Sequence, residues 1–332
     1  MMEEKVDNKI ELDKKTDLAN KTDLANKTDL EMNSRTDCDV NLNSVFSQGR
    51  MKKRIILDKL AKKVFSLSTL FALLVLGILF YQIGTQSAGW INWKFLTGNL
   101  SISPERAGIR GVIMGSVLLM AVVTPITLII GVSTAIYLEE FAKPGMIQTI
   151  IKTNISNLAG VPSVIFGLLG LTVFSRLMGL GSSILAGGLT MSLLVLPIVV
   201  VSSQEAIRAV PGFLRDASYA IGATKWTTIK NVVIPASIPG ILTGSILALS
   251  RAIGETAPLV VLGIPALIMK TPGSLFDDFT ALPIQIYYWT MDSVLTAEYA
   301  NLAAATIVVL LVLLFLMNSV AIIIRNKFQK RY

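Results

Sequence analysis

The stretch from Phe213 to Pro235 decides the fold and reads F-L-R-D-A-S-Y-A-I-G-A-T-K-W-T-T-I-K-N-V-V-I-P. Asp216 suits the start of a helix, where a carboxylate accepts hydrogen bonds from free backbone N–H groups. Ala217 and Ser218 are small and allow another surface to approach closely. Gly222 suits a helix end that needs a positive φ angle. The first half of the stretch therefore predicts a short helix that ends in a sharp turn.

A second short helix is expected in the other half of the stretch. Trp226, Ile229 and Val233 recur at helical spacing, which indicates one apolar face. Pro235 is expected to stop this helix before the next apolar run, because proline lacks the N–H group that a helix interior uses. The stretch thus predicts a helix–turn–helix knob, which we define as residues 213–235, between two long apolar runs.

Apolar runs of membrane-spanning length surround the knob. A helix needs about 20 apolar residues to cross the hydrocarbon layer of a membrane. The predicted spans cover residues 64–84, 111–138, 153–175, 183–203, 237–257 and 299–324. The shorter run 256–269 contains Pro258 and Pro265, so we read it as a helix end followed by a re-entrant or extracytoplasmic segment. The sequence therefore predicts an all-α membrane protein with six transmembrane helices.

The composition supports a membrane protein and excludes several other classes. The mean hydropathy is +0.63 and 16% of the residues are charged, whereas soluble domains carry about a quarter. The chain has no histidine and one cysteine, Cys38, so it has no internal disulfide and lacks the usual zinc, haem and histidine-based catalytic sites. The net charge of +8 comes from basic residues beside apolar runs, which argues against nucleic acid as a partner.

Residues 1–50 differ from the rest of the chain. The motif K-T-D-L-A-N occurs twice in succession and begins a third time between Lys15 and Leu30. Such a segment has too few large apolar groups to form a core. We therefore expect residues 1–50 to be a disordered, low-complexity cytoplasmic tail, and residues 51–332 to form the membrane domain.

The distribution of basic residues predicts the orientation of the chain. Lysine and arginine cluster before the first predicted span and after the last one, and short basic loops stay on the cytoplasmic side. Both termini are therefore expected to be cytoplasmic, together with loop 204–230. Loops 84–110 and 270–298 are then outside, where tryptophan and tyrosine fit the membrane interface.

One predicted span carries charge in its interior. Arg251 and Glu255 are four residues apart, so in a continuous helix they share one face. Charged groups at this depth usually face the bundle interior or a water-filled path. We place them, with Ser250 and Thr256, on a substrate path; a structural ion pair is the alternative. Two GxxxG pairs also predict close helix approach; they are Gly111 with Gly115 and Gly240 with Gly244.

The knob resembles the permeases of ABC importers, whose cytoplasmic loop follows the pattern E-A-A-x3-G-x9-I-x-L-P. The spacing matches throughout, with conservative changes at four positions. The matching residues are Asp216, Ala217, Ser218, Gly222, Val232, Ile234 and Pro235. The resemblance implies that the knob is a coupling helix that sits in a groove of a separate ATPase. The chain has no G-x-x-x-x-G-K-[ST] loop, so ATP and Mg²⁺ are expected on that partner, and the chain itself is expected to have no enzymatic activity or cofactor.

Two further stretches resemble the phosphate-specific permeases of bacteria, and they are more similar to the A-type permease than to its paralogous C type. One is S-R-A-I-G-E-T-A-P-L at residues 250–259, and the other is A-G-V-P-S-V-I-F-G-L-L-G-L at residues 159–171, which includes Gly160, Pro162 and Ser163. The resemblance covers roughly residues 55–330. It implies a bacterial inner-membrane importer built from two different permeases, two copies of an ATPase and an extracytoplasmic phosphate-binding protein.

The charged residues give independent support for phosphate. A guanidinium group binds tetrahedral oxyanions through paired hydrogen bonds. A neighbouring carboxylate repels such an anion unless the anion donates a proton, and at neutral pH phosphate keeps at least one O–H group whereas sulfate has none. Permeases for sulfate, molybdate or phosphonate are the alternatives within the class. An ATP-independent secondary transporter or channel is the alternative from another class, although no inverted second half is visible.

Overall fold

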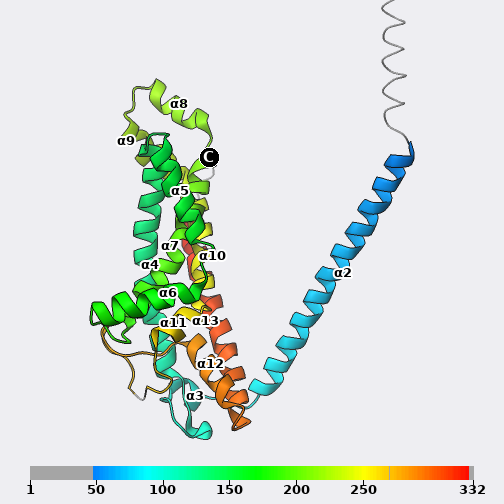
Figure 1. Ribbon diagram of the computed structural model, residues 1–332, viewed down its shortest axis with the longest axis vertical. Coiled ribbons are helices and arrows are strands. Elements are labelled where there is room, and N and C mark those ends of the chain that lie inside the picture. Colours follow the sequence, from blue (N-terminus) through cyan, green and yellow to red (C-terminus); the bar gives the residue numbers. More distant parts are fainter. Residues whose placement is uncertain (1–47, 269, 329–332) are drawn as a thin grey trace, which may run out of the picture. The chain divides into compact units, whose positions relative to one another are not determined.

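A computed structural model describes residues 48–268 and 270–328, and the chain divides into two units, residues 1–78 and 79–332 (Figure 1). The described part of the first unit is helical and belongs to α2, which runs from Gln48 to Ser87 and so continues into the second unit. Its apolar part, Ile55–Ser87, is longer than the predicted span 64–84. Of the predicted tail, residues 1–47 lie outside the described residues.

The described residues of the second unit form helices, and one isolated bridge pairs Ser183 with Asp278. The elements are α3 (Trp93–Thr97), η1 (Pro104–Arg106), α4 (Arg110–Ile136), η2 (Tyr137–Phe141), α5 (Met146–Leu158), α6 (Ser163–Leu169), η3 (Gly170–Leu177), α7 (Ile184–Arg208), α8 (Gly212–Ala220), α9 (Lys225–Thr228), η4 (Ile229–Val233), α10 (Ile234–Ile253), α11 (Ala257–Leu262), α12 (Leu282–Asp292) and α13 (Glu298–Phe328). Across the described residues, five helices are long and apolar enough to cross a membrane, and a bent pair makes a sixth if counted as one span.

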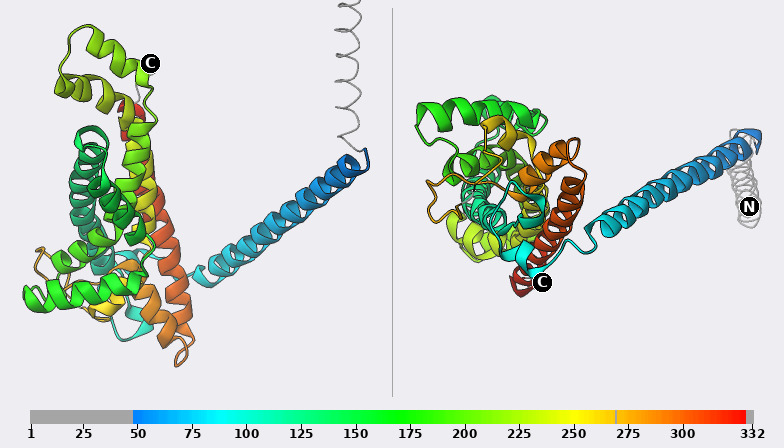
Figure 2. Two further views of the ribbon diagram at one scale, coloured as in Figure 1. Left: turned by 45° about the horizontal axis from the view of Figure 1, so that its top comes forward. Right: turned by 90° about the horizontal axis from the view of Figure 1, so that it is seen from below.

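The bent pair covers the predicted third span at 153–175 and begins at Met146. Helix α5 and the continuous segment α6–η3 meet at an angle of 102° (Figures 1 and 2). The break contains Gly160 and Pro162. The N–H of Gly160 donates to the carbonyl of Asn157 at 3.0 Å, which closes a tight turn, and Pro162 has an extended ψ of 135°. Proline has no N–H group for the ladder and disfavours a helical residue before it, so the helix restarts at Ser163 in a new direction.

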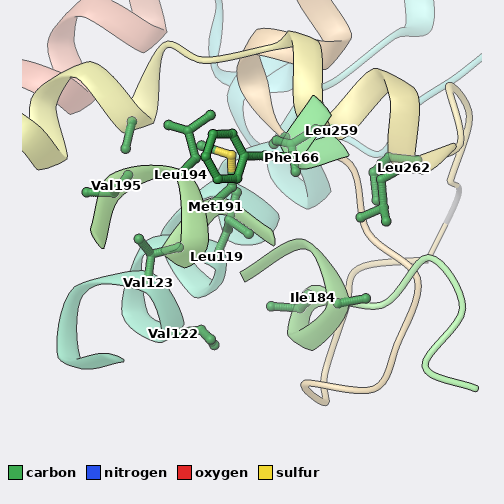
Figure 3. Close-up of a cluster of buried hydrophobic side chains, with 14 of the residues drawn as sticks. Leu119, Val122, Val123, Phe166, Ile184, Met191, Leu194, Val195, Leu259 and Leu262 are labelled. Atoms are coloured by element: carbon green, nitrogen blue, oxygen red, sulfur yellow. The ribbon is translucent and has the colours of Figure 1, made fainter. Parts of the chain in front are cut away.

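The core of the second unit lies between α4, α7 and the helices that cross them. Side chains from α4, α6, α7 and α11 interdigitate there (Figure 3). Glycines allow the close approach, because a Cβ atom at Gly131 would lie 2.8 Å from Val199 and one at Gly188 would lie 2.5 Å from Val122. Phe279, in the loop before α12, is fully buried in the same core. Loop residues therefore complete this helical core.

The two GxxxG pairs behave differently. A Cβ atom at Gly240 or Gly244 would collide with side chains of α7, so this pair confirms the predicted close approach of two helices. A Cβ atom at Gly115 would collide with the carbonyl oxygen of Thr280, which belongs to a loop. At Gly111 the nearest atom, Cα of Thr271, would be 3.8 Å away, which is ordinary contact. Of the pair Gly111 and Gly115, only Gly115 therefore makes a close contact, and this contact is with a loop and not with a helix.

Candidate functional site

The knob consists of α8, a turn and α9, as the sequence predicts. Gly222 has a φ of 82°, in the left-handed region that glycine adopts without strain. The hydroxyl groups of Ser218 and Thr228 are 2.9 Å apart in the buried space between the two arms. Thr224 caps α9, since its hydroxyl oxygen accepts from the N–H of Thr227. The small residues of the first arm therefore serve to pack the second arm.

The helix boundaries within the knob differ from the prediction at both ends. Helix α8 begins at Gly212, after Pro211, so Asp216 lies inside the helix and does not cap it. Proline suits the start of a helix, because the N–H group that it lacks would have no partner within the helix there. Pro235 does not stop the second helix, which continues from Lys225 to Ile253. The wider π-type turn η4 directly precedes Pro235 and accommodates the missing backbone hydrogen bond.

The knob exposes a group of large apolar side chains. Ile221 is 86% exposed and Trp226 58% exposed, and Phe213 and Tyr219 are exposed as well. Beside them, a hollow of 370 Å³ lies between the arms. Its lining residues are Leu214, Ala217, Ser218, Ile221, Asn231, Val232 and Ala236. An exposed apolar group of this kind, beside a hollow, is typical of a surface that binds another protein.

An ion-pair cluster that sequence reasoning missed joins the base of the knob to the bundle. Glu139 and Glu140 follow the uncharged run 111–138 directly, which is the signal the sequence contains. Glu139 pairs with Arg208 at the end of α7, and Glu140 pairs with Arg215 in α8. All four ion pairs found among the described residues belong to this cluster. The knob is therefore held by contacts with residues distant in sequence.

The charged residues of the fifth span lie at a helix break. Helix α10 ends at Ile253, and α11 begins at Ala257 with Pro258 in its first turn. Arg251 and Glu255 therefore do not share a helical face, which corrects the prediction, and they form no ion pair in the described structure. Arg251 is exposed and Glu255 is partly exposed. Pro258 breaks the helix because it lacks the N–H group that would continue the ladder.

The two polar neighbours of these charges have structural contacts. The hydroxyl of Ser250 bonds to Oδ1 of Asn318 at 2.6 Å, which links α10 to α13. The carbonyl of Thr256 accepts the N–H groups of Leu259 and Val260, which starts α11. Ser250 therefore faces a neighbouring helix, and the backbone carbonyl of Thr256 accepts the first hydrogen bonds of α11.

The two stretches with phosphate-permease resemblance lie side by side. Gly160, Pro162 and Ser163 form the break between α5 and α6. Helix α6 then packs on α11, because a Cβ atom at Gly167 would lie 2.8 Å from Cα of Pro258. Phe166 and Leu259 are neighbours in the same core (Figure 3). The two helices that follow the breaks, α6 and α11, are thus packed together although they are about 90 residues apart in sequence.

Comparison with known proteins identifies relatives over most of the chain. Residues 127–331 match the family described as "Binding-protein-dependent transport system inner membrane component". The "Probable ABC transporter permease protein YqgI" of Bacillus subtilis is 35% identical over 207 residues, 62% of this chain and 70% of that protein. The "Phosphate transport system permease protein PstA" of Yersinia pestis is 31% identical over 281 residues, 84% of this chain and 91% of that protein.

Solved structures share the fold at lower identity. A chain of the inward-facing MetNI methionine ABC transporter has a TM-score of 0.53 and 17% identity, and the match covers 67% of this chain and 96% of that one. A chain of a bacterial ABC transporter for the polysaccharide alginate has a TM-score of 0.51 and 15% identity, covering 82% and 100%. At these identities the likeness concerns the fold alone.

Proposed function

Because this chain belongs to the family of binding-protein-dependent transport system inner membrane components, we propose that it is the permease component of an ATP-driven importer of inorganic phosphate. The observation that carries the substrate is the placement of Arg251 and Glu255 at one helix break. Arg251 lies in the last turn of α10, and Glu255 lies in the break before α11, the helix that packs on α6 at Gly167. Relatives named as phosphate permeases support the same substrate.

Phosphate recognition at this site rests on Arg251 and Glu255. Arg251 is exposed on this chain and available to an oxyanion, and it would supply paired hydrogen bonds. Glu255 would accept a hydrogen bond from the O–H group that phosphate still carries at neutral pH, and it would repel sulfate. Because Arg251 ends α10 and Glu255 lies in the break that follows, the two side chains are not held on one helical face and are free to separate around an anion. We therefore assign them to the substrate path and treat Ser250 as a support.

We propose that ATP and Mg²⁺ are bound by a partner ATPase, present in two copies, and that the knob is the part of this chain that docks on it. The exposed Phe213, Ile221 and Trp226 would supply apolar contact, and the hollow between the arms would receive a complementary side chain. A paralogous permease would complete the path, and an extracytoplasmic phosphate-binding protein would deliver the substrate.

The orientation in the bacterial inner membrane follows from this assignment. The knob and both termini would be cytoplasmic, while α3 and α12 would lie on the outer side. Arg325, near the end of α13, donates to Thr243 in the first half of α10, which leads out from the knob. The last turns of α13 therefore lie along the part of α10 that is nearest the knob, in keeping with a cytoplasmic C-terminus.

Uptake of labelled phosphate and sulfate by the complete transporter in proteoliposomes, with and without ATP, tests the proposal. We expect ATP-dependent phosphate uptake and no sulfate uptake. Glu255→Gln should reduce phosphate uptake at least tenfold while the ATPase stays bound, and Glu298→Gln, an exposed carboxylate at the start of α13, serves as the matched control. Sulfate uptake in place of phosphate uptake, or undiminished transport by Glu255→Gln, contradicts the assignment.

A further inference from the structure

Three consecutive residues at the end of α4 each contact a different part of the molecule next to the knob. They are Glu139, Glu140 and Phe141, which we call the 139–141 triplet, and they lie in the π-type turn η2. A π turn rotates successive side chains by less than an α turn does and is common at functional positions. The three side chains of this turn nevertheless have separate partners.

Glu139 joins α4 to two other helices. Its Oε2 accepts from Nε of Arg208 at 3.0 Å and its Oε1 accepts from Nη2 at 2.9 Å, so the pairing with the end of α7 is bidentate. Nζ of Lys152, in α5, lies 2.9 Å from Oε1. The side chain of Glu139 is only 11% exposed. The side chain of Arg208 is 47% exposed, and the bidentate geometry of the pair fixes both distance and direction.

Glu140 holds the first arm of the knob. Its Oε1 accepts from Nη2 of Arg215 at 3.1 Å, and the side chain of Glu140 is 10% exposed. The same guanidinium group donates to the carbonyl oxygens of Val210 at 2.8 Å and Ile207 at 3.0 Å. Arg215 therefore ties α8 to the end of α4 and to the end of α7 at the same time.

Phe141 contacts the second arm of the knob. Its ring centroid is 6.4 Å from that of Trp226, and Nζ of Lys225 lies 5.5 Å from the Phe141 centroid. Aromatic pairs and cation–π contacts at these distances are attractive. The triplet consequently contacts α5, α7, α8 and α9.

We propose that the 139–141 triplet transmits the movement of the knob to α4, α5 and α7, and that its three members are positioning residues for ATP-coupled transport. This inference rests on the proposed function of the knob as the ATPase-docking segment. When the ATPase moves the knob, Arg215 pulls on Glu140, and Phe141 follows Trp226. Glu139 passes the displacement to α7 through Arg208 and to α5 through Lys152. Without the triplet, the movement of the knob would reach the spans only through its covalent connections to α7 and α10.

The first experiment measures coupling in the complete transporter. Glu140→Gln and Phe141→Leu should keep ATP hydrolysis within about twofold of the wild type, while phosphate taken up per ATP hydrolysed falls at least tenfold. A purely structural role would lower both activities together. Glu205→Gln is the matched control, because Glu205 also pairs with Arg208 but lies on the same helix and is 65% exposed. The proposal is overturned if the triplet variants take up as much phosphate per ATP hydrolysed as the wild type does.

The second experiment does not depend on the substrate. Cys38 is the single cysteine of the chain, so a Cys38→Ser background accepts spin labels at Ile221, which is 86% exposed on the knob, and at Met146, which is 80% exposed on α5. Glu139→Gln combined with Glu140→Gln should broaden the distance distribution between the labels, and Glu205→Gln should leave it narrow. If Glu139→Gln prevents folding, Phe141→Leu replaces it.

The two experiments separate the possible failures. An unchanged distance distribution in the triplet variants shows that the knob does not depend on these contacts and overturns the inference. If the distribution broadens in the triplet variants but the wild-type transporter takes up no phosphate, the result supports the role of the triplet and contradicts only the proposed substrate. A broadened distribution together with normal uptake per ATP overturns the role in transmission.

Discussion

Gly115→Ala tests the close approach between α4 and the loop that precedes α12. A Cβ atom there would collide with the carbonyl oxygen of Thr280 and would lie 3.4 Å from the ring of Phe279. The loop cannot move freely, because Phe279 is fully buried and the N–H of Leu282 donates to Oγ of Ser116 at 2.8 Å. The added methyl group therefore forces the loop backbone to shift within a packed core.

The magnitude follows from three contributions. Overpacking of a core typically costs about 1–3 kcal/mol. Weakening the hydrogen bond between Ser116 and Leu282 adds about 1 kcal/mol, and the better helix propensity of alanine offsets about 1 kcal/mol. We expect Gly115→Ala to lower the free energy of unfolding by about 2 kcal/mol. A Cβ atom at Gly111 would meet no close atom, so Gly111→Ala should raise the free energy of unfolding by about 0.5–1 kcal/mol.

Reversible unfolding in mixed lipid–detergent micelles, followed by circular dichroism, measures both variants against the wild type. The two glycines belong to the same GxxxG pair, so an explanation from helix–helix dimerisation predicts equal losses at both positions. Equal stabilities of the two variants, or a greater loss for Gly111→Ala, would refute the reasoning from the loop contact.

Two further predictions concern polar contacts. Ser250→Ala and Asn318→Ala should each lower the free energy of unfolding by about 1 kcal/mol. A double-mutant cycle should give a coupling energy of similar size. A coupling energy of zero would contradict the structural role of Ser250 and favour its predicted role on the substrate path. The backbone N–H groups of Gly273 and Ser274 hold the pKa of Asp277 below its ordinary value. This stabilisation is present at neutral pH and is lost as the pH falls below about 3.9 and through the lowered pKa. Asp277→Asn should therefore lower the melting temperature at pH 7 and have no effect in strong acid, and an equal effect at both pH values would contradict this assignment.

Local patterns were sufficient for much of the fold. Long uncharged runs indicated the apolar helices, because their length matches the membrane and a helix pairs all the polar backbone groups of such a run within the run itself. Gly222 was predicted to adopt a positive φ, since the requirement belongs to a single residue. The knob between α7 and α10 was also predicted, because small residues and helical spacing are local properties.

Helix boundaries near prolines were predicted less well. The bend in the third predicted span was not foreseen, and Asp216 was expected to begin a helix that starts instead at Gly212, directly after Pro211. Pro235 was expected to end a helix, yet the π turn before it allows the helix to continue. Whether a proline breaks a helix depends on how its neighbours rearrange and on what packs against the break. The spacing of apolar residues in the sequence gives no information about either factor.

The sequence by itself determined the apolar helices, the place of the knob and the presence of Arg251 and Glu255 near the end of one span. Only the tertiary structure decided that this span breaks after Ile253, that α11 packs on α6 beyond the break, and that Glu139 and Glu140 hold the knob. Those two carboxylates pair with arginines 69 and 75 residues away. Contacts over such separations arise from the packing of whole helices, so no local pattern of residues specifies them.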